Sequence, residues 1–393
     1  MERSRTAPHS FDALVTDVGD RGPLAGLRAL GRAGVRTVAV APRGAAGLRS
    51  RYAAAREVAP DPADAPAAFA QRLSEVIDDL RPRVVYPGRE EAIDAMVWSP
   101  HHAELSHLLP YPSLDPLEQL RDKRGLPELA SDHGLDACRT LAEGPAATVA
   151  AEVGDRECAV KSARPGGALQ ATQLVHSADE LRVLLDLLPP EEDVIVQEHC
   201  SGELLGLALV VDGDAQLIAR FQQTASRTWP LDAGASASAV SVAPDDSLVD
   251  CARRLLAEVG YVGLAHLQFL RTDDRCVLID INPRFYGSMP LALAAGVNLP
   301  AAWHEVATGD PQPMVGEYEL GLRFRWLEGN LLAAGRGDGL RALVDGGFGR
   351  RAGAIWSADD PVASAAWSAG AVRQRFGRRL SRRNGRRAVP VKH

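Results

Sequence analysis

The segment 264–288, LAHLQFLRTDDRCVLIDINPRFYGS, predicts the part of the structure around which the chain is organised. Apolar and polar residues alternate over 264–270 and again over 276–282, and a short polar turn separates the two stretches. This pattern is typical of a β-hairpin. We therefore expect two adjacent antiparallel strands here.

Oxygen-bearing side chains gather on one face of the predicted hairpin. Side chains two residues apart in a strand point the same way, so Asp280 and Asn282 should share a face and Ile279 should lie on the opposite one. Gln268 stands on the partner strand, and Arg284 follows the proline that ends the second strand. Oxygen ligands suit Mg²⁺ and a guanidinium suits phosphate, so the pattern favours a metal–phosphate site. The alternative, an ordinary polar hairpin, is disfavoured because such groups are costly on a core strand unless they bind something.

The run Asp280-Ile281-Asn282-Pro283-Arg284-Phe285, with Gly287-Ser288 after it, resembles the metal-binding strand of the ATP-grasp superfamily. Gln268 fits the metal-ligand position on the preceding strand, and the whole set is most similar to the carbamoyl phosphate synthetase type of domain. The resemblance implies that Gln268, Asp280 and Asn282 hold Mg²⁺, with Mn²⁺ as an alternative ion. The usual acid in this motif is Glu, and Asp280 is one methylene shorter, so one metal ion is as well supported as two.

The resemblance also implies an architecture that is α/β plus α+β. A parallel-sheet pre-ATP-grasp domain is expected at 1–115, and a strand–helix–strand pattern over 11–40 supports it. A two-lobed ATP-grasp domain is expected at 116–315, with lobes at about 116–195 and 196–315. A C-terminal extension is expected at 316–371, packed on the body, and a basic, disordered tail at 372–393.

Composition supports a globular protein, with 46% hydrophobic and 24% charged residues. There is no apolar run long enough to span a membrane, and the N-terminus lacks the apolar core of a signal peptide. The five cysteines are scattered without CxxC spacing, so we expect free thiols in a cytoplasmic protein. The net charge is −7 although residues 372–393 are basic without an acid, and the acidic body argues against nucleic acid as its partner.

Lysine is scarce, and its placement is informative. Only Lys123, Lys161 and Lys392 are lysines among 44 basic residues. In such a background, a lysine within the fold suggests that a compact ammonium is needed there. Lys123 is expected on a helix over 117–134 that breaks at Pro127, and a surface lysine is the alternative reading. The resemblance implies that Lys123 and Lys161 contact phosphates of ATP.

The same resemblance implies the other nucleotide contacts. Lys161 precedes a loop of small residues, in which the backbone of Gly166 and Gly167 would approach phosphate oxygens. The adenine edge would meet Gln197, Glu198, His199 and Cys200, and Glu203 would accept from the ribose hydroxyls. The segment 221–242 is polar and rich in small residues, so we expect a long functional loop. Within it, Arg227 would clamp a carboxylate or acyl phosphate, although a solvent-exposed arginine is an equal alternative.

Together these features predict an ATP- and Mg²⁺-dependent ligase that activates a carboxylate as an acyl phosphate and joins it to an amine. Lys161, Arg227 and Arg284 are the expected catalytic residues, because phosphoryl transfer requires neutralised phosphate oxygens and a positioned nucleophile. One alternative is a bicarbonate-activating enzyme like biotin carboxylase or carbamoyl phosphate synthetase. Another is a non-catalytic ATP-binding regulatory protein. Small-molecule substrates are the expected partners, and a homodimer is a common assembly among similar ligases.

Overall fold

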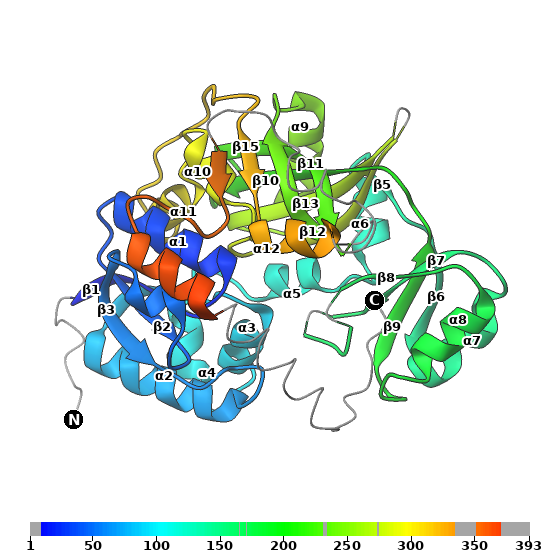
Figure 1. The fold of residues 1–393 in the computed structure, drawn as a ribbon, viewed down its shortest axis with the longest axis horizontal. Helices are drawn as coiled ribbons and strands as arrows, with labels where there is room; N and C mark the ends of the chain where they lie inside the picture. Colours follow the sequence, from blue (N-terminus) through cyan, green and yellow to red (C-terminus); the bar gives the residue numbers. More distant parts are fainter. Residues whose placement is uncertain are drawn as a thin grey trace.

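A computed structural model describes residues 9–164, 166–169, 171–230, 234–272, 275–334 and 351–370 of the 393-residue chain. The predicted basic tail lies outside these residues. The described part is built on three β-sheets, which Figure 1 shows as separate groups of strands. None of its helices is both long and apolar enough to pass through a lipid bilayer.

The first sheet is parallel and belongs to the N-terminal part of the chain. Its strand order is β3-β2-β1-β4. The strands are β1 (Phe11–Val15), β2 (Thr37–Ala41), β3 (Ala53–Val58) and β4 (Pro82–Tyr86), and the helices α1 (Arg21–Arg32), α2 (Pro66–Leu80) and α3 (Glu90–Val97) connect or follow them. Near-continuous apolar strands such as β2, which is buried throughout, are expected of a parallel sheet covered on both faces. The predicted parallel-sheet N-terminal region is confirmed.

The second sheet is a smaller four-stranded unit with the order β6-β9-β7-β8. It contains β6 (Thr140–Pro145), β7 (Cys158–Ser162), β8 (Gln173–Val175) and β9 (Asp193–Glu198), with α7 (Ala146–Val153) and α8 (Ala178–Leu185) packed on it. It has a hydrophobic core of its own, to which α8 contributes Leu181 and Leu185. In Figure 1 this unit lies on the side of the molecule opposite the N-terminal sheet.

The third sheet has eight strands in the order β16-β15-β12-β11-β10-β13-β14-β5. Its strands are β5 (Asp136–Ala137), β10 (Glu203–Val211), β11 (Leu217–Trp229), β12 (Ala235–Ser241), β13 (Gly263–Arg271), β14 (Cys276–Asn282), β15 (Arg323–Arg325) and β16 (Arg351–Gly353). The helices that accompany it are α9 (Asp246–Glu258), α10 (Pro290–Ala294), α11 (Leu299–Thr308) and α12 (Leu327–Ala333). The expected hairpin is β13–β14, two antiparallel strands beside the edge strand β5.

Two expectations about secondary structure are wrong. The helix expected over 117–134 is two helices, α5 (Asp115–Arg121) and α6 (Leu126–Asp132), and Lys123 lies in the connection between them. The break comes before Pro127, which stands in the first turn of α6, where proline is tolerated. The functional loop expected over 221–242 is mostly the paired strands β11 and β12, and only its centre, 231–233, lies outside the described residues.

The β13–β14 pairing contains a β-bulge that the alternating pattern did not predict. Gln268 pairs with Asp280, but the next residue, Phe269, pairs with Leu278, so Ile279 is the extra residue. Because a bulge inserts one extra residue, the alternation of side chains between the two faces shifts by one residue at that point. Ile279 therefore lines the same cleft as Asp280, against the prediction that it lies on the opposite face.

The end of the described chain returns to the N-terminal sheet. Residues 361–370 form a helix, seen in orange-red beside α1 in Figure 1. Asp360, just before it, accepts hydrogen bonds from Nε of Arg28 at 2.8 Å, Oγ of Ser50 at 2.8 Å and the backbone N–H of Arg51 at 3.0 Å. The first and last described segments are thus joined by a buried ion pair. The remaining short helix, α4 (His102–Leu105), follows α3.

Candidate functional site

A cleft of about 880 Å³ collects side chains from the second and third sheets, from the connection that holds Lys123 and from the start of α1. Its size is in the range of small-molecule sites. Most of the predicted site residues line it: Lys123, Lys161, Gln197, Glu198, Cys200, Glu203, Arg227, Gln268, Asp280, Asn282 and Arg284. Residues that are far apart in sequence therefore meet in one cavity.

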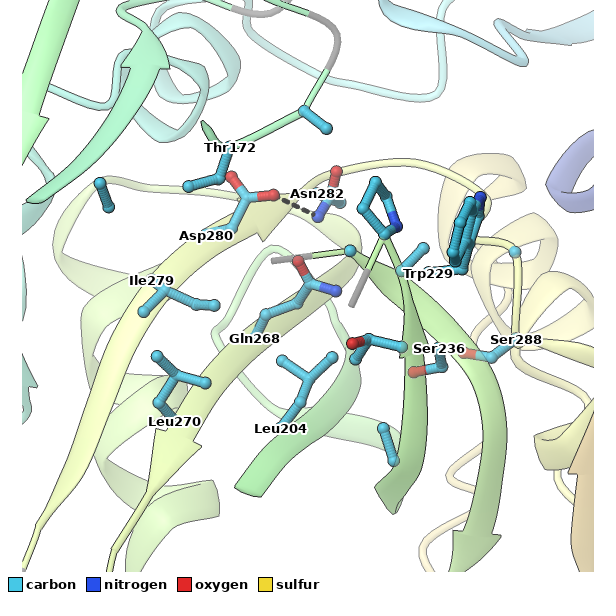
Figure 2. Close-up of a pocket in the computed structure, with 18 of the residues that line it drawn as sticks. Thr172, Leu204, Trp229, Ser236, Gln268, Leu270, Ile279, Asp280, Asn282 and Ser288 are labelled. Carbon is cyan, nitrogen blue, oxygen red and sulfur yellow. Dashed lines mark hydrogen bonds between the residues drawn. The ribbon is translucent and has the colours of Figure 1, made fainter. Parts of the chain in front are cut away.

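The centre of the cleft holds the predicted oxygen ligands. Gln268 and Asp280 are direct partners across β13 and β14, so their side chains lie on one face. Nδ2 of Asn282 donates to Oδ2 of Asp280 at 2.9 Å, the contact dashed in Figure 2. Nζ of Lys123 lies 3.8 Å from Oδ1 of Asp280. One carboxylate, two amides and one ammonium thus meet at this point.

Lys161 connects the second sheet to the hairpin. Its Nζ donates to the carbonyl oxygen of Ile279 at 3.1 Å. Ile279 is the bulged residue, and the bulge removes it from regular ladder pairing. Burial, followed by the nearby charge of Lys123, lowers the pKa of Lys161. The two lysines thus face a common space, and each would be stabilised in its charged form by an anion placed between them.

Arg284 is held by a carboxylate at the start of helix α3. Its Nε donates to Oε1 of Glu90 at 2.6 Å, and its Nη2 donates to Oδ1 of Asn282 at 3.1 Å. Nε of Arg121 donates to the other carboxylate oxygen of Glu90 at 2.8 Å. Burial alone would raise the pKa of Glu90, but the charges of Arg284 and Arg121 outweigh it and lower the pKa. Glu90 is therefore a charged bridge that fixes Arg284 at the cleft.

One side of the cleft is apolar and lies next to β9. Figure 2 shows Leu270 and Ile279 on one side of Gln268, and Ser236 and Ser288 on the other. Leu204, at the start of β10, lines the same cleft and is buried. Apolar walls beside backbone groups suit the flat ring of a nucleobase. This is the side on which the expected adenine contacts Gln197, Glu198 and Cys200 lie.

Several predicted contacts have protein partners in this structure. Nε2 of Gln197 donates to the carbonyl oxygen of Cys138 at 3.4 Å. Glu203, at the edge of the cleft, accepts from Nη2 of Arg271 at 2.8 Å. Nη1 of Arg227 donates to Oδ1 of Asn330 at 2.9 Å, so this arginine is not the exposed side chain of the alternative reading. A ribose or a carboxylate would share or exchange these partners on binding.

Three predicted nucleotide residues are not among the described residues that line the cleft. His199 turns toward Glu157, with Nδ1 at 3.2 Å from Oε2. A side chain at Gly167 would collide with Glu192 and Ser162, and Gly166 lies nearest Asp94. The contacts of these three residues with a nucleotide stay predictions.

Sequence reasoning missed Glu90 and Arg21, which begin the helices α3 and α1 of the N-terminal region. Arg21 begins α1 in the turn after β1 and lines the cleft, with Cζ 3.6 Å from the ring centroid of Trp326. The available signal was position, because ligands of parallel sheets bind beyond the carboxyl ends of the strands. That signal does not say which side chain of the turn reaches a cleft formed with a distant segment.

Comparisons with known proteins agree with this geometry. Residues 214–330 match a family model described as ATP-grasp in the biosynthetic pathway with Ter operon. Carbamoyl phosphate synthase large chain of Agathobacter rectalis is 24% identical over 181 residues. That match covers 44% of this chain and 16% of the relative, so the chain spans a small part of that protein.

Two solved structures share the fold across most of the chain. The biotin carboxylase domain of Hydrogenobacter thermophilus 2-oxoglutarate carboxylase, in complex with MgADP, ADP and bicarbonate, has a TM-score of 0.60 and 16% identity over 78% of this chain and 71% of that one. Biotin carboxylase of Campylobacter jejuni, in complex with an ATP compound, has a TM-score of 0.60 and 15% identity over 80% of this chain and 74% of that one. The family model, the sequence relative and the shared fold together support an ATP-grasp superfamily member.

Proposed function

We propose that the protein is an ATP- and Mg²⁺-dependent ligase that activates a substrate carboxylate as an acyl phosphate and joins it to an amine. The observation that carries the proposal is the convergence of Lys123 and Lys161, from separate segments, on the Gln268–Asp280–Asn282 group in one cleft. Opposite charges placed this way suit the triphosphate of a metal–nucleotide complex. The printed names of the similar proteins are carbamoyl phosphate synthase and biotin carboxylase.

The donor set of the hairpin fits Mg²⁺. Gln268, Asp280 and Asn282 offer oxygen atoms, and Asp280 is the single carboxylate among them. Mg²⁺ commonly takes one or two carboxylates from the protein and its remaining ligands from water and phosphate. When bound, it would neutralise phosphate oxygens of ATP. This arrangement supports one ion more directly than two, and Mn²⁺ is an alternative with the same donor preference.

The cationic side chains supply the positioning that phosphoryl transfer needs. Lys123 and Lys161 would hold phosphate oxygens as compact point charges. Arg284, fixed by Glu90, would face the oxygens that carry charge while the carboxylate attacks the γ-phosphate. The γ-phosphorus–oxygen bond to ADP breaks as the acyl phosphate forms, and attack by an amine then releases inorganic phosphate.

A bicarbonate-activating enzyme is the second candidate. Its support is the fold shared with two biotin carboxylases, one of them in complex with bicarbonate. Against it, the cleft extends past Arg284 to Arg227 and Ser236, which leaves room for an acid larger than bicarbonate. The proposal also includes a cytoplasmic location, which rests on the scattered cysteines of the sequence. It includes a homodimer because dimers are common among similar ligases.

The test is ADP release by the purified protein with Mg²⁺–ATP and a panel of carboxylic acids, with and without amines. Hydroxylamine in place of the amine would trap an acyl phosphate as a hydroxamate. We expect ADP and hydroxamate to form together with at least one acid, and bicarbonate alone to give neither. Bicarbonate-dependent ADP release without any response to larger acids would favour the second candidate.

Matched variants connect the activity to the cleft. Lys161→Met removes the ammonium that contacts Ile279, and Asp280→Asn removes the single carboxylate of the donor set. Both should lower turnover at least about a hundredfold, as loss of a preorganised charge does. Arg182→Gln, on the exposed face of α8, is the control and should leave turnover unchanged. Full turnover by Lys161→Met would contradict the site assignment.

A further inference from the structure

Arg21 is a half-buried cation that lines the cleft beside Gly287 and Trp326. Its Nη1 atom is buried and has no hydrogen-bond partner among the described residues. Burial lowers its pKa to about 10, although Glu328 and Asp20 act in the opposite direction. A buried N–H group of a guanidinium without an acceptor is costly unless a ligand supplies one. The proposed contacts with ATP do not include Arg21, so they supply no acceptor for its Nη1 atom.

The position of Arg21 is set by close packing against the segment that follows β14. A Cβ atom added to Gly287 would lie 3.2 Å from Cζ of Arg21, so a side chain there would press on the guanidinium. On its other side the guanidinium lies over the ring of Trp326, with Cζ 3.6 Å from the centroid. The group is thus held between a backbone segment and an indole, with its nitrogen atoms at the cleft.

Other unpartnered polar atoms line the same cleft. Nε1 of Trp326, the hydroxyl of Tyr286 and Nε2 of His266 are buried and have no hydrogen-bond partner in the described structure. The rings of Tyr286 and His266 stack with centroids 4.0 Å apart, which fixes both side chains. A guanidinium and an indole N–H can only donate. A ligand here must therefore present acceptor oxygens and negative charge.

We propose that this part of the cleft is a subsite for a second, non-reacting carboxylate of the acid substrate, bound by Arg21 with Trp326. The inference rests on the proposed ligase function. The reacting carboxylate belongs near Arg284, which is hydrogen-bonded to Asn282 at the predicted metal group. Arg21 lies beyond it, beside Gly287. The substrate class is accordingly a dicarboxylic acid or an amino acid whose main carboxylate is not the one activated, and a planar carboxylate matches the fork of a guanidinium.

The test compares acids that differ by one carboxylate. The pairs are glutarate with pentanoate, L-glutamate with 4-aminobutyrate, and L-aspartate with 3-aminopropanoate, each with saturating Mg²⁺–ATP and hydroxylamine. We expect the wild-type protein to prefer the member with the extra carboxylate in at least one pair. Arg21→Gln should raise the KM for that member by about 30-fold, the usual scale for losing one partner of a buried charge pair, and should change the KM of its partner less than about threefold.

Further variants separate binding from folding. Arg21→Lys keeps the positive charge but loses the two parallel N–H groups of the guanidinium. It should therefore keep only part of the wild-type preference for the acid with the extra carboxylate. Trp326→Phe keeps the ring under the guanidinium and removes the indole N–H, so it should give a smaller loss in the same direction. Arg32→Gln, on the same helix but paired with Asp359 at the surface, is the matched control and should keep the preference. Circular dichroism of each variant would show that the fold is retained.

A binding measurement keeps this inference distinct from the ligase proposal. With Mg²⁺ and a non-hydrolysable ATP analogue, the preferred dicarboxylate should raise the Tm of the wild-type protein and not that of Arg21→Gln. Turnover without any preference for the second carboxylate would overturn the subsite and leave the ligase proposal standing. A Tm shift that Arg21→Gln abolishes, without ADP release, would overturn the ligase and keep the site. The carboxylate assignment would be overturned if neither a preference nor a Tm shift is observed. It would also be overturned if the protein selects 3-phosphoglycerate over glycerate more strongly than it selects any dicarboxylate over its partner.

Discussion

Glu90 shows how much of the site depends on one side chain outside the hairpin. Its two oxygen atoms accept from Arg284 and Arg121, at 2.6 and 2.8 Å. The carboxylate is only 10% exposed, so the two positive charges have little water to compensate them if it is lost. The position of Arg284 is therefore decided by helix α3 as well as by the segment that follows β14.

Glu90→Gln is expected to weaken both the fold and the activity. Removing one member of a buried ionic group leaves the other charges uncompensated, which costs about 3 kcal/mol in the free energy of unfolding. Turnover should fall at least about tenfold because Arg284 is no longer held in one place. Urea unfolding and ADP release measure the two effects. Glu91→Gln, whose carboxylate lies 4.0 Å from Arg89, is the control, and an equal loss in both variants would contradict a special role for Glu90.

Asp17 gives a prediction about pH. Burial raises its pKa to about 6, although the hydrogen bond from Thr16 and the charge of Arg89 lower it in part. An acid whose pKa is higher in the folded state stabilises the fold below its unfolded pKa near 4, and that contribution is lost as the pH rises toward 6. Relative to the wild type, Asp17→Asn should therefore become more stable between pH 4 and pH 7, by up to about 3 kcal/mol.

The backbone at this position makes that comparison a fair one. Asp17 has a φ of 55°, in the left-handed region, which asparagine tolerates nearly as well as aspartate. Urea unfolding of both proteins at pH 4, 5, 6 and 7 gives the difference in free energy directly. A difference that stays constant across this range would show that the carboxyl group does not titrate as its burial implies.

At the level of the elements, the hairpin was predictable and its bulge was not. Alternation over 264–270 and 276–282 predicted β13 and β14, and the polar residues predicted which side chains line the cleft. The alternating pattern does not reveal that Ile279 is the extra residue of the bulge. An alternation of apolar and polar residues is equally compatible with a bulge at a neighbouring position or with none. The carbonyl oxygen of Ile279 accepts a hydrogen bond from Lys161, which joins the hairpin to the second sheet. Bulges of this kind occur often beside functional sites.

The strands β11 and β12 were missed for a different reason. Much of β12 is alanine and serine, ASASAVS, and such residues carry little of the β-branched and aromatic signal on which strand prediction depends. Pairing with β11 and β15 stabilises it instead, and most of its residues are buried. Glu90 and Arg21 were missed because no local pattern shows which distant segment a turn will meet.

Helix α1 sets the distance between the N-terminal sheet and the cleft. A Cβ atom at Gly22 would lie 2.8 Å from the carbonyl oxygen of Phe285, and one at Gly26 would lie 2.6 Å from the ring of Phe285. The two glycines are one turn apart on the same face of the helix. They allow α1 to pack directly on the segment that follows β14, where Arg21 enters the cleft.

Gly26→Ala is expected to separate these elements. The added methyl meets a fully buried ring, so the fold should lose about 1–3 kcal/mol, the usual cost of overpacking. The higher helix propensity of alanine offsets part of that loss, by about 1 kcal/mol. Thermal unfolding measures the net effect. Gly213→Ala, where nothing lies within 4 Å of the added atom, is the control, and equal behaviour of the two variants would contradict tight packing at Phe285.

Across the whole molecule, the cleft exists only where separate parts of the chain meet. Lys161 comes from the second sheet, Asp280 from the third, and Glu90 from the helix that follows the first. Sequence order alone placed the lysines upstream of the hairpin, but their convergence is a property of the complete fold. The site should accordingly respond to changes that loosen any one of these parts, including parts far from the cleft.

The return of the chain end to α1 is the clearest case of such a distant part. Asp360 is 1% exposed and accepts three hydrogen bonds from Arg28, Ser50 and Arg51 of the N-terminal region. The contact with buried Arg28 is also an ion pair. Asp360→Asn should cost about 3–5 kcal/mol, because it leaves Arg28 buried without its counter-charge. Asp359→Asn, whose carboxylate is 40% exposed, should cost about 1 kcal/mol or less.

The two variants also test whether the described chain unfolds as one unit. If the contact between residues 351–370 and α1 is part of a single cooperative core, Asp360→Asn should shift the urea midpoints of circular dichroism and tryptophan fluorescence together. If residues 351–370 unfold independently of the rest, fluorescence from Trp356 and Trp367 should change at low urea. The urea midpoint measured by circular dichroism should then stay that of the wild type. A buried ion pair between the two ends of the described chain favours the first outcome, since neither charge can be exposed to water while the other stays folded.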